Sequence, residues 1–152
     1  YKAMALATIG CAVLSLAFTR VHDALPIVMQ LRSDRAVSVR KAVAEACAYF
    51  DGADSFQTLQ SLIADKSPTV REYAVIALGF MHACRRDAIA VLREMRSTWP
   101  DTTIHEAIHS RVRLGDDEVL SDLVELCESQ GLAPVLVEAL YDLPYLHENA
   151  RL

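Results

Sequence analysis

Two histidines four residues apart are the clearest candidates for chemistry in this sequence. His105-Glu106-Ala107-Ile108-His109 matches the pattern H-E-x-x-H, and Glu128 follows after 18 intervening residues. On a helix, histidines at this spacing can bind one zinc ion, the glutamate between them can act on the bound water, and a later glutamate can supply a third ligand. The pattern defines one hypothesis, a metal-binding module or metal-dependent enzyme built on this helix.

The surrounding sequence favours a simpler interpretation of these residues. The spacing resembles that of zinc aminopeptidases, but the glycine-rich strand motif and the Asn-Glu-Gly context of that family are absent. Glu128 instead lies at the end of an amphipathic helical pattern. We therefore expect His105 and His109 to lie on a solvated helix face, and we expect no metal, no cofactor and no catalytic residue.

The chain that must position these residues consists of near-copies of one unit. An acidic residue opens the first helical pattern of each unit, at positions roughly 31 to 33 residues apart: Asp23, Asp54, Asp87 and Glu118. A second apolar helical pattern then begins at Val39, Val70, Thr103 or Ile104, and Leu132. Two helices per unit at this period predict a solenoid, in which each unit buries its apolar face against its neighbours.

Apolar residues recur at fixed positions of both helices. In the first helix they form one stripe: Leu25, Val28 and Leu31; Phe56, Leu59 and Leu62; Ile89, Leu92 and Met95; Leu120, Leu123 and Leu126. In the second helix they fall at offsets 0, 4, 7, 8 and 11: Val39, Val43, Ala46, Cys47 and Phe50; Val70, Ala74, Ala77, Leu78 and Met81; Leu132, Leu136, Ala139, Leu140 and Leu143. The third unit fits two registers, because Thr103 at offset 0 places Ser110 and Arg111 in apolar slots, whereas Ile104 brings Ile108 and Val112 into them.

The turn between the two helices of a unit repeats an acidic and a basic residue. An aspartate precedes the second helix and an arginine lies near the start of that helix, in the pairs Asp34 with Arg40 and Asp65 with Arg71. We expect these residues to form ion pairs from one unit to the next. The hydroxyl of Ser38 or Ser67 can cap the second helix.

The clearest copy of the second helix and its preceding turn is Asp65-Lys-Ser-Pro-Thr-Val70-Arg71-Glu-Tyr-Ala74-Val-Ile-Ala77-Leu78-Gly79, and Asp34 to Phe50 is a looser copy. This pattern resembles the HEAT repeat family in its short version of roughly 30 residues. The resemblance implies an all-α fold, a right-handed α-solenoid of antiparallel helix pairs whose second helices line a concave binding face. Short repeats of this type also occur in phycobilin lyases, so a lyase-like accessory protein is an alternative function.

The same family supplies a second enzymatic hypothesis. The HEAT-like hydroxylase that acts on deoxyhypusine holds two irons with His-Glu steps on several repeats, and Ile104-His105-Glu106-Ala107 resembles one such step. The equivalent positions of the other units are Lys41-Ala42, Glu72-Tyr73 and Ala133-Pro134. The remaining ligands are therefore missing, and we expect no di-iron site.

The repeats divide the chain into one array: the second helix of an incomplete repeat at 1–20, repeats at 21–51, 52–83, 84–116 and 117–146, and the start of a further unit at 147–152. The uncharged stretch 3–19 could also be a targeting or membrane segment. However, it is weakly apolar, and Thr8, Ile9 and Gly10 align with Ala77, Leu78 and Gly79. Because the sequence starts without methionine and ends where a unit opens, we expect a fragment of a longer protein.

The composition of the chain argues against several classes of function. The formal net charge of -5 argues against a protein that binds the phosphate backbone of nucleic acids. No Cys-x-x-Cys pair occurs among the four cysteines, Cys11, Cys47, Cys84 and Cys127. Reduced thiols in a cytoplasmic protein are favoured over disulfides or a zinc site.

The binding face of the array should lie at offsets 2, 6 and 10 of the second helices. These positions are Lys41, Glu45 and Tyr49; Glu72, Ile76 and Phe80; His105, His109 and Arg113; Pro134, Glu138 and Asp142. Tyr49 and Phe80 can anchor a protein or peptide partner, although an ordinary solvated face is the alternative. The prediction is a non-catalytic scaffold for protein binding, without a nucleic-acid or membrane partner and with an oligomeric state that the sequence does not define.

Overall fold

The computed structural model of the chain describes residues 2–19, 21–95 and 101–130, together with positions 137, 139 and 141. These residues form α-helices and two short 3-10 helices, and no strand occurs among them. The elements are α1 (Lys2–Phe18), η1 (His22–Ala24), α2 (Leu25–Gln30), η2 (Leu31–Ser33), α3 (Val37–Cys47), α4 (Ala53–Leu62), α5 (Pro68–Leu78), α6 (Arg85–Glu94), α7 (Asp101–Arg113) and α8 (Val119–Gln130).

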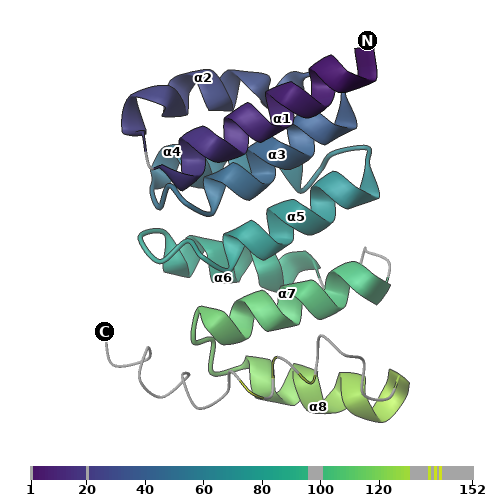
Figure 1. Cartoon of the computed structure of the whole chain (residues 1–152). Coiled ribbons are helices and arrows are strands. Elements are labelled where there is room, and N and C mark those ends of the chain that lie inside the picture. The colour runs from purple at the N-terminus through teal and green to yellow at the C-terminus, as the bar shows by residue number, and fades with distance from the viewer. Residues whose placement is uncertain are drawn as a thin grey trace.

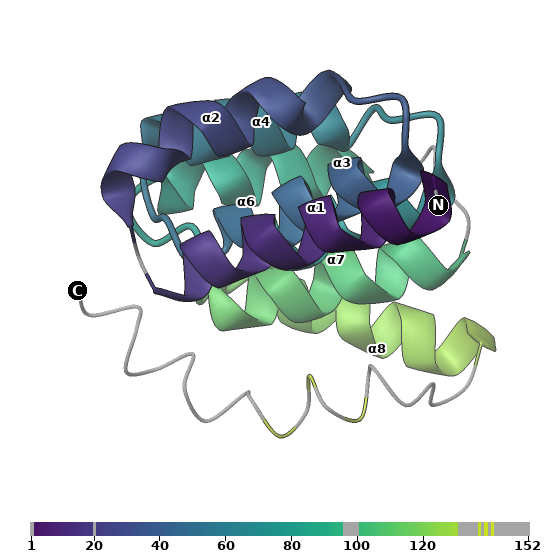
Figure 2. The same ribbon diagram turned by 45° about the horizontal axis from the view of Figure 1, so that its top comes forward.

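The helices stack in two layers, as Figures 1 and 2 show. In one layer α1, α3, α5 and α7 lie side by side, and each contacts the next. The other layer holds α2, α4 and α6, and α4 packs against both α3 and α5. Helix α8 follows α7 and packs against it. The chain is therefore an all-α solenoid, as the repeat pattern predicts.

The apolar slots of the second helices are buried in both α3 and α5. All ten predicted residues from Val39 to Phe50 and from Val70 to Met81 are at most 2% exposed. In α4, Leu59 is fully buried and belongs to the same core cluster as Leu78. The prediction of these slots is confirmed, and burial of their apolar side chains is the main favourable contribution to the stack.

One first-helix position was wrongly predicted. Leu120 is 46% exposed, whereas the preceding residue, Val119, is fully buried. Val119 and Leu123 pack with Ile108 and Val112 of α7 in a second core cluster. Helix α8 therefore begins its inward stripe at Val119 instead of Leu120, while Leu123 and Leu126 face the cluster as the repeat pattern predicts.

Helix α1 packs along α3, in the same manner as α3 packs along α5. Among the α1 residues whose burial is described, Val13 and Ala17 are buried, while Thr8 and Ile9 are exposed. Ala77 and Leu78, with which Thr8 and Ile9 align, are buried between helices on both sides, so exposure alone does not test that alignment, and it stays a prediction. No helix within the described residues is long and apolar enough to cross a membrane.

Helix α7 is buried along two stripes, which explains why its sequence fits two registers. All five slots of the Thr103 register, from Thr103 to Leu114, are at most 5% exposed. Ile108 and Val112 of the other register are also buried, but they belong to the cluster shared with α8. Ile104 is only half-buried, so the Thr103 register describes the side of α7 that faces α5.

Helices α5 and α7 approach closely at one glycine. A β-carbon at Gly79 would lie 2.8 Å from Ser110 Oγ and 2.9 Å from Ser110 Cβ. Ser110 Oγ in turn donates a hydrogen bond of 3.0 Å to the carbonyl oxygen of Val75. A polar residue therefore occupies an apolar slot of α7 because it binds the backbone of α5.

The turns before α3 and α5 are closed by aspartate side chains. Asp34 Oδ1 accepts a hydrogen bond from Ala36 N at 2.7 Å, and Asp65 Oδ1 accepts one from Ser67 N at 2.8 Å. The predicted serine caps were wrong, because Ser38 lies inside α3 and Ser67 makes no side-chain cap bond. The aspartates, rather than the hydroxyls, fix the chain where it enters these helices.

An ion pair connects the first of these repeats to the next, as the recurrent aspartates and arginines predict. Arg40 Nε lies 2.7 Å from Asp65 Oδ2, and its NH2 group lies 2.9 Å from Oδ1. A further nitrogen of Arg40 donates to the carbonyl oxygen of Asp34, and Arg71 donates in the same way to the carbonyl oxygen of Asp65. The hydrogen bond from Arg40 lowers the pKa of the Asp65 carboxyl and raises the pKa of the guanidinium.

Candidate interaction face

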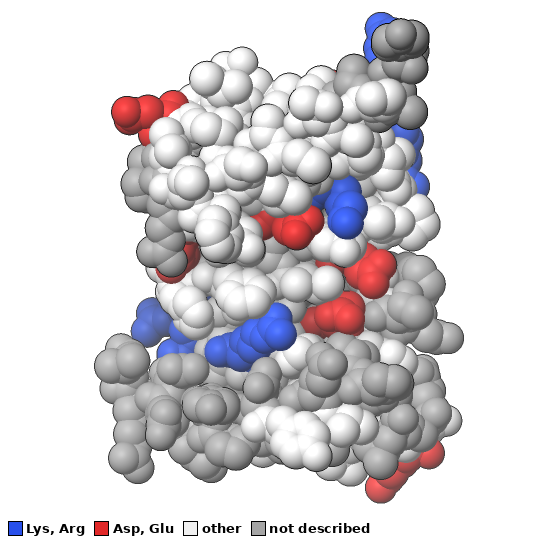
Figure 3. Space-filling model, viewed as in Figure 1, with Lys and Arg blue, Asp and Glu red and all other residues white. Residues whose placement is uncertain are grey.

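Helices α1, α3, α5 and α7 form the surface that is turned toward the viewer in Figure 3, and α3 and α5 with the turns that follow them carry the first six residues of the predicted binding row. We call this surface the front face and define its centre by Lys41, Glu45, Tyr49, Glu72, Ile76 and Phe80. Tyr49 is 40% exposed and Phe80 is 39% exposed. The other four residues are half-buried, so this part of the predicted row lies at an accessible surface.

A cleft of about 410 Å³ opens on the front face between α3 and α5. Small side chains make room for it, since Ala48 and Ala77 lie among larger neighbours. Its lining residues are Glu45, Ala48, Tyr49, Tyr73, Ile76, Ala77 and Phe80. Three aromatic rings and one carboxylate in one concave surface can hold an apolar side chain and a neighbouring cation.

Aromatic and basic side chains contact one another across the front face. The ring centroids of Phe18 and Tyr49 are 6.2 Å apart in an edge-on arrangement. Lys41 Nζ lies 4.0 Å from the ring centroid of Tyr73, and the Arg113 guanidinium lies 4.8 Å from that of Phe80. Both distances suit a cation–π interaction. The rings of Tyr73 and Phe80 are therefore already in contact with basic side chains of the same chain.

The acidic side chains of the front face differ from the basic ones in their contacts. Neither Glu45 nor Glu72 makes a side-chain hydrogen bond or ion pair with any part of the chain that the structure describes. Figure 3 shows acidic side chains over the middle of the face, between basic side chains above and below. Within the described residues, the face therefore has two carboxylates without an ion pair at or next to its apolar cleft.

Comparison with known families gives the same assignment as the geometry. The family model of HEAT repeats matches residues 24–111, which is more than half of the chain. The chain belongs to the HEAT repeat family. No curated protein matches the sequence. The match identifies the repeat and no subtype, so the resemblance to phycobilin-lyase repeats stays a prediction.

Helix α7, the second helix of the third repeat in this HEAT array, does not continue the accessible face. His105 and Arg113 are half-buried, but His109 is only 3% exposed. Ala139 belongs to the same buried cluster as Ile108 and Val112 of α7. The expectation that His109 lies on a solvated helix face was wrong, while Glu138 and Asp142 of the predicted row lie outside the described residues.

The H-E-x-x-H motif lies in the middle of α7. Within residues 2–19, 21–95, 101–130 and the three isolated positions, no three His, Cys, Asp or Glu side chains gather as metal ligands would. Glu128 is exposed on α8. The metal hypothesis thus still depends on the spacing of His105 and His109 alone.

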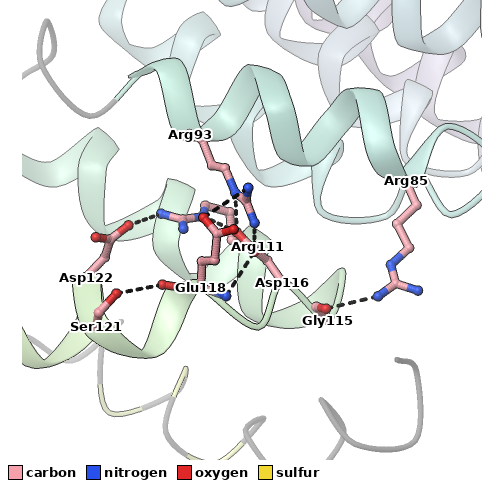
Figure 4. A network of polar contacts seen from close by, with 8 residues as sticks. All are labelled: Arg85, Arg93, Arg111, Gly115, Asp116, Glu118, Ser121 and Asp122. Carbon is pink, nitrogen blue, oxygen red and sulfur yellow. Dashed lines mark hydrogen bonds and ion pairs between the residues drawn. The ribbon is translucent and has the colours of Figure 1, made fainter. Parts of the chain in front are cut away.

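A buried network of charged groups joins α6, α7 and α8, as Figure 4 shows. Its centre is Asp116, whose side chain is fully buried in the turn after α7. Arg111 Nε donates to Asp116 Oδ2 at 2.6 Å, Arg93 of α6 binds both carboxylate oxygens, and Arg111 also reaches Asp122 of α8 at 2.6 Å. The repeat pattern did not predict this network, because it treats offset 8 of the second helix, here Arg111, as apolar.

The carboxyl group of Asp116 is held in its charged form. Burial alone would raise its pKa, but hydrogen bonds from Arg93 and Arg111 act in the opposite direction, and the net effect lowers the pKa. Asp116 lies in the turn that follows the end of α7 at Arg113, and Gly115 in this turn has a φ of 71°. Asp116 N donates to the carbonyl oxygen of Arg111, and Gly115 N to that of Val112, the pattern of a helix closed by a left-handed glycine.

Two cysteines, Cys47 and Cys84, have a shifted pKa, and neither shift favours a reactive thiol. Burial raises the pKa of Cys47 to about 12, and burial also raises the pKa of Cys84. A raised pKa leaves less thiolate at neutral pH, and the thiolate is the nucleophile. All four cysteines are free thiols.

Two residues of the front face were missed by the sequence analysis. Tyr73 lies at offset 3, next to the predicted row, and Phe18 lies at the end of α1, for which no face was predicted. Phe18 is 75% exposed and meets Tyr49. The signal for Phe18 was present, since an exposed aromatic at the end of each of α1, α3 and α5 continues the same row.

Proposed function

We propose that this HEAT array is a non-catalytic scaffold that binds a protein or peptide partner on its front face. The observation that carries the proposal is the cleft between α3 and α5, which exposes Tyr49 and Phe80 beside small apolar residues. Aromatic residues in a concave, partly apolar surface are the usual anchors of protein interfaces. Among HEAT proteins, binding of other proteins is also the common role.

The proposal includes a cytoplasmic location. It is supported by four free cysteines, because oxidising compartments favour disulfides. The acidic balance of the chain makes a nucleic-acid partner unfavourable.

Selection from a displayed library of random peptides tests the proposed face. Peptides selected on the wild-type protein should lose binding to the double variant Tyr49→Ala/Phe80→Ala, because the variant removes both anchors of the cleft. A matched control is Leu120→Ala/Val124→Ala, which removes two exposed apolar side chains of α8.

Circular dichroism of both variants checks that their helical content equals that of the wild type. Retained binding to the control variant together with loss of binding to the cleft variant supports the proposal. Peptides that bind the cleft variant as tightly as the wild type would place the interaction elsewhere and contradict it.

A further inference from the structure

The charges around the cleft indicate which partner it binds. We propose that the front face takes a basic peptide segment, whose apolar side chain enters the cleft and whose lysine or arginine pairs with Glu45 and Glu72. This inference rests on the proposed function and specifies the chemistry of the partner.

The lining of the cleft is mostly apolar. Six of its seven lining residues are aromatic or apolar: Ala48, Tyr49, Tyr73, Ile76, Ala77 and Phe80. Tyr49 and Phe80 keep about two-fifths of their surface exposed. Covering these rings with an apolar side chain removes apolar surface from water, which favours binding.

The basic and the acidic side chains of the front face differ in whether they already have a partner among the described residues of the chain. Lys41 and Arg113 already lie against the rings of Tyr73 and Phe80. Glu45 lines the cleft and Glu72 lies on the adjoining turn of α5, and within the described part of the chain neither has an ionic partner. A cation of the partner would therefore pair with two half-buried carboxylates that have no ion pair among the residues that the structure describes.

An acidic partner would be repelled by the carboxylates of the front face. Its carboxylates would approach Glu45 and Glu72 at short range, and like charges brought together across an interface cost several kcal/mol. The formal net charge of -5 also repels an acidic partner at longer range and attracts a basic one.

Three labelled peptides of equal length provide the test, one of leucine and lysine, one of leucine and glutamine, and one of leucine and glutamate. Fluorescence anisotropy measures their affinities for the wild-type protein. The leucine–lysine peptide should bind at least about tenfold more tightly than the glutamine peptide, and more tightly still than the glutamate peptide. Its affinity should fall when salt is raised from about 0.1 M to about 1 M, because the Debye length shortens from about 10 Å to about 3 Å.

Matched variants distinguish the effect of the front-face carboxylates on peptide affinity from the effect of the overall net charge. Glu45→Gln/Glu72→Gln should weaken the leucine–lysine peptide about tenfold. The control Glu94→Gln/Glu128→Gln changes the net charge by the same amount at exposed positions of α6 and α8, and it should leave the affinity within about twofold. Equal losses in the two variants would show non-specific attraction and overturn the inference.

The two proposals can fail separately. If selected peptides require Tyr49 and Phe80 but are neutral or acidic, the proposed function stands and the basic-partner inference is wrong. If Tyr49→Ala/Phe80→Ala leaves the affinity of the leucine–lysine peptide unchanged, both are wrong.

Discussion

The junction between α3 and α5 and the junction between α7 and α8 solve the same packing problem in different ways. Between α3 and α5 the slots are filled by apolar side chains that are at most 2% exposed, and one ion pair, Arg40 with Asp65, closes the edge. At the other junction, Arg111 occupies an apolar slot and Asp116 lies at the centre of an ionic network. The first junction leaves its front side open as a cleft, whereas His109 of α7 is 3% exposed.

This difference assigns different roles to the two regions. At the apolar junction the slots are filled without charged side chains, and within the described part of the chain Glu45 and Glu72 at its edge make no ion pair. An ionic junction consumes its charges internally, because a buried charge must be paired. We therefore expect binding at the α3–α5 junction, and we expect the α7–α8 junction to be the more sensitive to changes of charge.

The largest effect should come from the buried carboxylate of the ionic junction. Asp116→Asn leaves Arg111, which is 4% exposed at its side chain, without its central partner, and should lower the free energy of unfolding by about 3 to 5 kcal/mol. Urea denaturation measures the change. Asp117→Asn, at the exposed next residue, is the control and should change stability by less than about 0.5 kcal/mol.

A cavity at the apolar junction should cost nearly as much. Leu78→Ala removes a fully buried side chain and should lower the free energy of unfolding by about 2 to 5 kcal/mol. Leu120→Ala, at a leucine that is 46% exposed, serves as the matched control in the same denaturation experiment. Similar losses for both leucines would mean that the burial pattern described above is incorrect.

Addition of one methyl group between α5 and α7 should have a smaller effect. Gly79→Ala places a β-carbon 3.0 Å from the Cα of Ser110, so the two helices must move apart at a cost of about 1 to 3 kcal/mol. Gly52→Ala is the control, because a β-carbon there meets no atom within 4 Å. Thermal unfolding that ranks Gly52→Ala below Gly79→Ala in stability would contradict the close approach.

Acid should weaken the ionic junction gradually. The pKa of Asp116 is lower in the folded chain than its ordinary value, so its contribution is fully present above the ordinary aspartate value of about 3.9 and is lost as the pH falls through the folded value. Asp116→Asn should therefore lose less stability than the wild type between about pH 5 and about pH 3. Parallel losses in the two proteins would show that Asp116 does not titrate as described.

The sequence was sufficient to predict the stack where the repeat is regular. The slots of α3 and α5, and the pairing of Arg40 with Asp65, follow from the period and from the recurrence of residue types. The prediction was less successful at α7 and α8, because periodicity identifies apolar stripes and cannot show that Ser110 and Arg111 are buried through polar contacts. Leu120 was misplaced for a related reason, since α8 packs with the α7 stripe that carries Ile108 and Val112.

The candidate face was only partly predictable. Spacing placed Tyr49 and Phe80 on one side of the second helices, but their exposure and the cleft between them depend on the small residues Ala48 and Ala77. The burial of His109 depends on the packing of other elements around α7, which the spacing of one helix does not contain.

Chemical-shift mapping by NMR tests the central claim most directly. Titration of the isotope-labelled chain with the leucine–lysine peptide should shift the resonances of Tyr49, Tyr73, Ile76 and Phe80 and leave those of α4 and α6 unchanged. Shifts confined to α4 and α6, or shifts that persist at the same residues in the Glu45→Gln/Glu72→Gln variant with unchanged affinity, would contradict a basic partner held on the front face.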